Sequence, residues 1–289
     1  SLSGACALPY TPAMSWHAQL QIDYCAEASR TVARYQHTGP LRILKSLYPE
    51  GDTICHNVLV HPPGGLVGGD TLDIHVHAAS GTHGLITTPG ATRFYRSQGE
   101  RAVQQSRITL EPGARFEWLP LENIAYSGCL AENRLQLNLE EGAELIGWDV
   151  TALGLPNAGL PFDTGRFSQH IEMPDVWLER GHIDATDLRL MNSPLGLAGN
   201  RCMASLFFAT GTPIERQRKQ QVLDVARDIM ATHDLRGTAG ATSPNPQVVV
   251  LRAVAPLVES AMDAMRQVWT AWRSLLWNQP ASSPRIWST

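Results

Sequence analysis

The sequence predicts a mainly β protein, a β-helix-like stack of mostly antiparallel strands with two α-helices in its C-terminal third. Three observations support this prediction. Apolar and polar residues alternate from Trp16 to about Thr210, turn-forming residues cluster between the alternating runs, and a strand–turn–strand unit recurs about every 30 residues. The chain has 289 residues and 43% hydrophobic content. We therefore expect one large β-rich domain over residues 15–289, after a flexible N-terminal segment, 1–14.

The alternation is clear in Trp16-His-Ala18-Gln-Leu20-Gln-Ile22 and in Leu135-Gln-Leu137-Asn-Leu139. Because successive side chains of a strand point to opposite faces, such runs are typical of half-buried strands. Between them lie Gly, Pro, Asn and Asp residues at Pro62–Gly65, Gly68–Asp70 and Pro156–Gly159, where turns need preset or unusual backbone angles.

The recurring unit is seen in the segments LDIHVHAASGTHGLITT, SRITLEPGARFEWLP and RLQLNLEEGAELIGWD, whose turn glycines are Gly81, Gly113 and Gly142. Each unit is too thin to close a core alone. Units of this kind at near-constant spacing favour a solenoid-like stack over a closed barrel.

Two segments have a helical pattern. Thr212, Pro213 and Glu215 provide a capping hydroxyl, a first-turn proline and a Glu that can reach back to the cap, so we predict a helix over about 213–233. A second helix is predicted over about 256–278, where an apolar, tryptophan-rich stripe recurs at helical spacing and Pro280 follows. The stripe fits a core-facing surface, and the alternative is a surface for a partner helix.

Composition narrows the class of protein. A formal charge of −4 gives no support for a uniformly basic, nucleic-acid-binding surface. Five widely spaced cysteines without a C-x-x-C pair argue against a disulfide framework or zinc finger and fit a reducing cytoplasm. No stretch reaches the roughly 20 apolar residues that cross a bilayer, so we expect no membrane association. A carbohydrate-binding solenoid is disfavoured because the tryptophans concentrate in the second predicted helix.

One metal-binding pattern is present. Asp73, His75 and His77 share one face of a predicted strand, and two imidazoles at i, i+2 can bind one divalent ion. This leaves open a metal-dependent hydrolase built on His75 and His77, with His83 as the nearest further ligand. The plainer interpretation is a solvated polar face, because the spacing supplies no third ligand.

Two loops invite functional interpretations. The loop Gly64–Asp70 has the glycines of a phosphate cradle, but it lacks the Gly-Lys-Ser/Thr ending and no predicted helix follows it. The segment Arg93-Phe94-Tyr95-Arg96 interleaves arginines with aromatics, as protein-binding hot spots do. It could equally pack its aromatics inward and leave its arginines in solvent.

Three carboxylates lie in apolar or glycine-rich surroundings: Asp70, Asp149 and Glu179. A carboxylate in such a place must be paired, hydrated or bound to a cation. Turn acceptors and salt-bridge partners are the plain alternatives. The chain has no G-x-S-x-G elbow and no H-E-x-x-H helix, so it offers little for catalysis.

The blocks His61-Pro-Pro-Gly-Gly-Leu-Val-Gly-Gly-Asp70 and Leu85-Ile-Thr-Thr-Pro-Gly-Ala-Thr-Arg-Phe-Tyr-Arg-Ser97, in this order, resemble the UreD (UreH) family of urease accessory proteins. Similar blocks extend over most of the chain, as at Glu117–Pro120, Leu145–Asp149 and Pro284–Trp287. One departure concerns the turn after Asp149, where Gly154-Leu155-Pro156 stands in place of an expected Gly-Arg-Pro. Leu155 therefore removes any arginine-dependent contact there.

The resemblance implies a β-helix-like cytoplasmic scaffold with two helices, no catalytic activity and no tightly bound cofactor. It implies binding to the urease apoprotein and to UreF, which recruits the GTPase UreG, and nickel in transit through a water-filled passage. Asp70, Asp149 and Glu179 are our candidates for lining that passage, and Arg93, Phe94, Tyr95 and Arg96 for partner binding. Self-dimerisation stays open.

Overall fold

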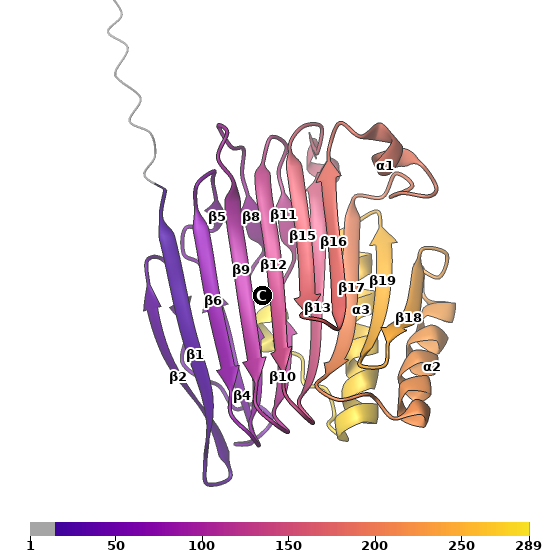
Figure 1. Ribbon diagram of the computed structural model, residues 1–289. Coiled ribbons are helices and arrows are strands. Elements are labelled where there is room, and N and C mark those ends of the chain that lie inside the picture. Colours follow the sequence, from indigo (N-terminus) through magenta and orange to yellow (C-terminus); the bar gives the residue numbers. More distant parts are fainter. Residues whose placement is uncertain (1–14, 289) are drawn as a thin grey trace, which may run out of the picture.

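The computed structural model describes residues 15–288, so the predicted flexible segment 1–14 lies outside the described residues. Two large β-sheets pack face to face (Figure 1). The seven-stranded sheet is in front in this view, and the twelve-stranded sheet lies behind it. The chain passes repeatedly from one sheet to the other, which confirms the predicted solenoid-like stack.

Four successive coils build the solenoid. Each coil places one strand in the seven-stranded sheet and one in the twelve-stranded sheet, and the first three add a second, short strand to the twelve-stranded sheet. The coils are β1 (His17–Glu27), β4 (Ile54–Val60) and β5 (Gly65–Leu66); β6 (Thr71–Ala78), β7 (His83–Thr87) and β8 (Thr92–Phe94); β9 (Ala102–Leu110), β10 (Arg115–Leu119) and β11 (Asn123–Ala125); and β12 (Leu130–Leu139) and β13 (Glu144–Leu155).

The coils pair in parallel, so the prediction of mostly antiparallel strands is wrong. The series β1–β6–β9–β12 and β4–β7–β10–β13 are parallel throughout, and so is β5–β8–β11. Alternation reports which face of a strand is buried but not the direction of its neighbour. The glycine turns do not close hairpins; Gly81, for example, with φ of +75°, joins β6 to a strand of the opposite sheet.

Antiparallel strands complete both sheets at their margins. They are β2 (Arg30–Thr38) beside β1 and β16 (Trp177–Asp184) beside β15 (Arg166–Met173); β3 (Arg42–Ile43) beside β4; β14 (Leu160–Pro161) beside β13; and β17 (Cys202–Thr210), β19 (Val248–Ala255) and β18 (Ala239–Asn245) in succession after β13. Strand β15 itself pairs in parallel with β12.

The described residues contain three α-helices rather than the two predicted: α1 (Leu188–Asn192), α2 (Arg216–Thr232) and α3 (Val258–Trp277), with 3-10 turns η1 (Pro156–Ala158) and η2 (Arg285–Ser288). The five-residue α1 is too short to show a helical period. Helix α2 begins later than predicted, because Glu215 rather than Thr212 is its N-cap. The Glu215 carboxylate accepts hydrogen bonds from the N–H groups of Gln217 and Arg218 in the first turn. Helix α3 ends at Asn278 in the left-handed conformation, before Pro280.

The two faces of the twelve-stranded sheet contact different cores. Its inner face packs on the seven-stranded sheet, as Leu145 of β13 does, and its outer face packs under α2 and α3, as Trp148 does. Trp269 and Trp272 of α3 are fully buried in the outer core. The core interpretation of the α3 stripe is therefore confirmed for these residues. No helix within residues 15–288 is long and apolar enough to cross a membrane.

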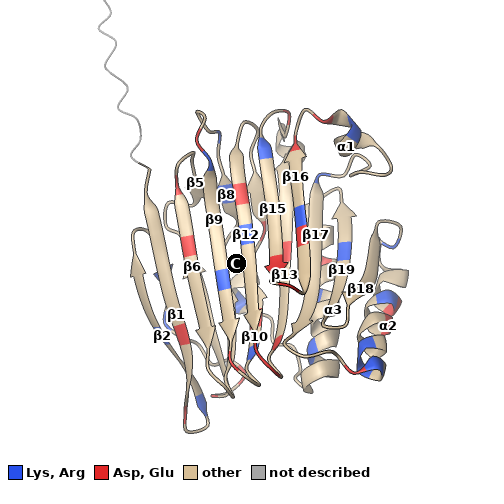
Figure 2. Cartoon of the chain, in the orientation of Figure 1, with Lys and Arg blue, Asp and Glu red and all other residues tan. Residues whose placement is uncertain are grey.

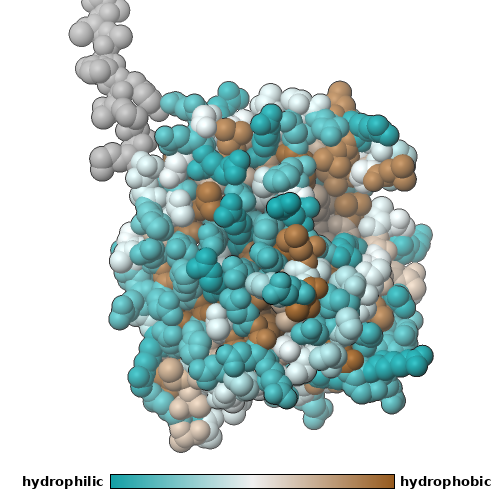
Figure 3. All heavy atoms as spheres, viewed as in Figure 1, coloured by the Kyte–Doolittle hydropathy of each residue, from teal (hydrophilic) through white to brown (hydrophobic). Residues whose placement is uncertain are grey.

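The outer face of the seven-stranded sheet is polar. Figure 3 shows it as mostly hydrophilic, and Figure 2 shows acidic and basic residues scattered over it without a continuous basic area. This is the solvent side of the predicted alternation.

Candidate functional site

A polar cluster lies between the two sheets. We call it the Asp149 cluster, and its members come from five strands: Gln104 (β9), Asn123 (β11), Asn133 (β12), Asp149 and Thr151 (β13), and Gln169 (β15). Each side chain occupies an inward position of its strand, on the face that elsewhere carries hydrophobic residues, such as Leu145 and Leu153 of β13.

Hydrogen bonds from neutral donors converge on the Asp149 carboxylate. Asn133 Nδ2 donates to Asp149 Oδ2 at 2.7 Å, and Asn123 Nδ2 donates to the same oxygen at 3.3 Å. Thr151 Oγ1 donates to Oδ1 at 3.1 Å. No lysine or arginine of the described chain forms an ion pair with Asp149, so the carboxylate, when ionised, is stabilised by dipoles alone.

The carboxyl of Asp149 has a raised pKa because the side chain is buried. Burial raises the pKa of its carboxyl to about 6, although the hydrogen bonds from Thr151, Asn133 and Asn123 act in the opposite direction. The side chain lies deep between the sheets, yet part of its surface stays accessible. One carboxylate and several side-chain amides therefore meet between the sheets.

A cavity of about 250 Å³ adjoins this cluster. It is lined by Gln104, His61, Arg93 and residues 88–92. Gln104 Nε2 donates to Asn133 Oδ1 at 3.1 Å, so Gln104 belongs to both the cavity and the Asp149 cluster. Polar groups therefore continue from the cavity wall to the buried carboxylate.

The other two predicted lining residues have different surroundings. Asp70 is buried, and it accepts from the backbone N–H of Val67 at 2.9 Å and of Trp16 at 3.3 Å, which fixes the glycine loop. Glu179 on β16 forms an ion pair with Arg252 on β19. No hydrogen bond or ion pair in residues 15–288 joins either of them to the Asp149 cluster.

The predicted partner-binding segment divides between surface and core. Phe94 is buried and packs edge-on against Phe167, with ring centroids 5.8 Å apart. Arg93 and Arg96 are exposed, and Tyr95 is 37% exposed and stacked on Tyr126. The segment thus presents two arginines and one aromatic face to solvent.

The predicted metal-binding histidines are each held by carboxylates on the outer sheet face. His75 Nε2 lies 3.0 Å from Asp73 Oδ1. His77 Nε2 lies 3.1 Å from Glu111 Oε1, and its Nδ1 lies 3.4 Å from Asp23 Oδ1. Within residues 15–288 no three His, Cys, Asp or Glu side chains are grouped so that they could hold a metal ion.

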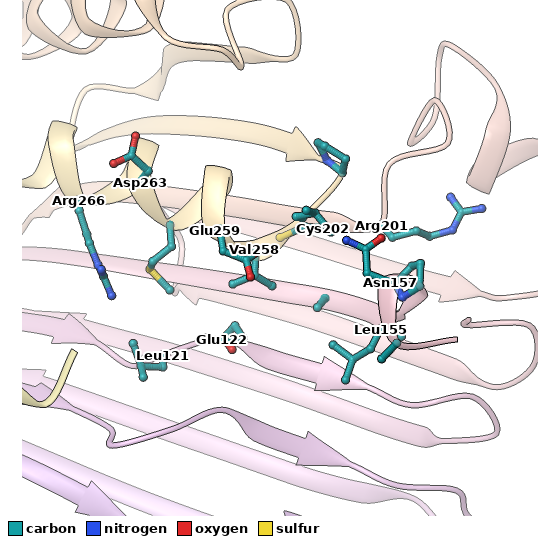
Figure 4. Close-up of a pocket in the computed structure, with 17 residues that line it drawn as sticks. Leu121, Glu122, Leu155, Asn157, Arg201, Cys202, Val258, Glu259, Asp263 and Arg266 are labelled. Carbon is teal, nitrogen blue, oxygen red and sulfur yellow. The ribbon is translucent and has the colours of Figure 1, made fainter. Parts of the chain in front are cut away.

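A groove of about 560 Å³ runs beside the first half of α3 (Figure 4). Leu155, the residue that departs from the expected arginine, lies at one end of it near Arg201, and Arg266 lies at the other. Glu122 and Glu259 line the groove between these ends. The groove therefore carries charges of both signs over an apolar floor.

Sequence reasoning missed a buried ion network between α3 and the twelve-stranded sheet. Arg273 Nη1 donates to Glu50 Oε1 at 2.7 Å, and Arg273 Nε lies 3.0 Å from Glu117 Oε1. His56 and His83 contact the same two carboxylates at 2.7 Å and 2.8 Å. An arginine inside an otherwise apolar helical stripe was the available signal.

Comparison with known proteins places the whole arrangement in a family. The family model described as UreD urease accessory protein matches residues 17–288. A urease accessory protein UreD of Polaromonas naphthalenivorans is 68% identical over 275 residues, which are 95% of this chain and all of that protein. Those of Variovorax paradoxus and Leptothrix cholodnii are 67% and 50% identical, each over 96% of this chain and all of the relative. The chain belongs to the UreD family of urease accessory proteins.

Proposed function

We propose that this chain is a non-catalytic scaffold of urease maturation that binds the urease apoprotein and UreF, joins UreG through UreF, and assists nickel insertion. Membership of the UreD family supports a role in urease maturation. The cytoplasm is the proposed location, and Cys25, Cys55, Cys129 and Cys202 are free thiols, as a reducing compartment requires.

The Asp149 cluster is the observation that carries the nickel part of this proposal. A deep carboxylate without a cationic partner favours a cation beside it, because the charge otherwise depends on dipoles alone. Carboxylate and amide oxygens hold a divalent ion weakly and exchange readily with water, which suits an ion in transit better than one in storage. Nickel is cargo in this account, and we propose that it passes Asp149 in a water-filled space between the sheets.

Asp70 and Glu179 stay in the proposal as flanking candidates. Their lone pairs are shared with backbone N–H groups and with Arg252, respectively. We therefore assign the larger effect on nickel transfer to Asp149.

Co-expression tests the scaffold role. The tagged chain is produced with the urease subunits, UreF and UreG, and the complex is recovered on the tag while urease activity is measured in parallel cultures with and without the chain. The proposal predicts a recovered complex and nickel-dependent activation only when the chain is present. Activation that is equal without the chain would contradict the proposal.

A further inference from the structure

A further apolar groove of the described chain lies outside the Asp149 cluster. It has a volume of about 770 Å³ and is formed between residues 44–49, which follow β3, and residues 282–286 near the C-terminus. Val58 and Thr87 of the twelve-stranded sheet lie beneath it. We call it the tail groove.

One wall of the tail groove is an exposed apolar surface. Leu44 is 47% exposed and Leu47 is 52% exposed, and both line the groove. A single exposed leucine is ordinary, but two that border one cavity of this size form a patch of the kind that binding partners cover.

The charged side chains that line the tail groove are positive. Lys45 and Arg285 line it, and neither forms an ion pair with any residue from 15 to 288. No Asp or Glu is among the described lining residues. The nearby carboxylate of Glu50 is already occupied by Arg273 and His56. A ligand that brings a carboxylate would therefore meet two unpaired cations.

The backbone at this wall can also accept a strand. Leu44 N–H donates to Val58 at 3.1 Å and Leu47 N–H donates to His56 at 2.9 Å, which leaves Lys45 and Ser46 in a bulge between the two bonds. The N–H groups of Lys45 and Ser46 make no hydrogen bond within the described chain. This stretch forms the outer edge of the twelve-stranded sheet, where extended peptides commonly add.

We propose that the tail groove binds an extended segment of a partner protein that carries leucine-type side chains and at least one carboxylate. This inference rests on the proposed function, since the partner is sought among the urease subunits, UreF and UreG. Residues 1–14 of this chain contain no Asp or Glu, so they cannot supply the carboxylate. A second copy of the chain is the remaining rival and is distinguished by the test.

The chain has only two lysines, Lys45 and Lys219, which makes a zero-length cross-link specific. A carbodiimide condenses a lysine amine with a carboxylate that touches it, with loss of water. On the purified complex we expect Lys45 to be joined to an Asp or Glu of a partner, as mapped by mass spectrometry. Lys45→Arg keeps the charge and abolishes this cross-link, whereas Lys219→Arg, on α2, keeps it.

A binding measurement complements the cross-link. Leu47→Asp places a carboxylate on the apolar wall, and we expect the complex to weaken by about tenfold or more. Leu195→Asp is the matched control, because Leu195 is 99% exposed after α1 and lies outside the groove. Circular dichroism and thermal unfolding establish that both variants fold.

The outcomes separate the two proposals. A complex that forms with the unaltered chain, but shows no Lys45 cross-link and is indifferent to Leu47→Asp, overturns the tail groove and leaves the scaffold role standing. A Lys45 cross-link to a second copy of this chain overturns the assignment to a partner protein. If the unaltered chain recovers no partner at all, the scaffold role fails, and the groove inference fails with it.

Discussion

Arg273 on α3 and Glu117 on β10 are both fully buried, and Arg273 Nε lies 3.0 Å from Glu117 Oε1. Trp269, one turn earlier on α3, donates from Nε1 to the same Glu117 oxygen at 2.8 Å. Glu117 thus connects the C-terminal helix to the middle of the solenoid. The pKa of the Glu117 carboxyl lies below its ordinary value. Burial alone would raise this pKa, but the hydrogen bond and charge of His83 and the charge of Arg273 lower it by more.

Breaking this pair should destabilise the fold strongly. Arg273→Met keeps the apolar stem but leaves Glu117 and Glu50 buried without their shared cation. We expect a loss of about 3–5 kcal/mol in the free energy of unfolding, measured by urea titration. Arg236→Ala, at an exposed position, is the control and should change stability by less than about 0.5 kcal/mol. Equal stability of the two variants would refute a role for the network in holding α3.

Asp149 should oppose stability at neutral pH. Its folded pKa of about 6 lies above the ordinary value of 3.8, so the folded state binds the proton more tightly than the unfolded state. The cost is absent below pH 4, grows as the pH rises, and is complete above pH 6. Asp149→Asn removes it, and we expect urea titrations to show a gain of about 1–3 kcal/mol at pH 7.5 that vanishes near pH 4. A gain that is independent of pH would contradict this account.

The turn between β9 and β10 needs a glycine for its backbone conformation, and not because a side chain would clash with its neighbours. Gly113 has φ of +71°, and a Cβ placed there would contact nothing within 4 Å. Gly113→Ala should therefore cost about 1 kcal/mol through the left-handed backbone alone. Gly113→Asn should cost less, because Asn tolerates this conformation. Thermal unfolding of both variants checks the order, and the reverse order would contradict the conformational explanation.

The C-terminal turn η2 should stabilise the outer core through Trp287. Its ring lies 5.3 Å from Trp148 and 5.4 Å from Trp269, and its Nε1 donates to Thr87 Oγ1 at 2.8 Å. We expect Trp287→Ala to cost about 2 kcal/mol and Trp287→Phe about 1 kcal/mol, since Phe keeps the ring contacts and loses the hydrogen bond. Chemical unfolding measures both changes, and an equal loss in the two variants would show that ring packing contributes little.

Much of the fold could be predicted because burial leaves a direct trace in the sequence. Alternation located the half-buried strands, and the spacing of Gly81, Gly113 and Gly142 indicated a stacked repeat. Strand direction could not be predicted, because a glycine turn looks the same whether it closes a hairpin or leads to the opposite sheet. The start of α2 was missed because Glu215 caps the helix itself, three residues after the expected Thr212.

The candidate site was predicted only in part. Asp149 stood out as a carboxylate in apolar surroundings, but its partners Asn133 and Gln169 come from distant strands that only the coiling of the chain brings together. A polar residue at an inward position, such as Asn133 between Ala131 and Leu135, was the trace that local reasoning overlooked. Asp70 has the same local character as Asp149, yet its hydrogen bonds fix a loop.

We propose that nickel passes the Asp149 carboxylate on its way to urease. The most direct measurement is the nickel content of urease matured with the unaltered chain or with Asp149→Asn, together with recovery of the complex in both cases. We predict that Asp149→Asn folds, keeps its partners and lowers nickel per urease roughly tenfold. Full nickel loading by a variant that assembles normally would contradict the claim.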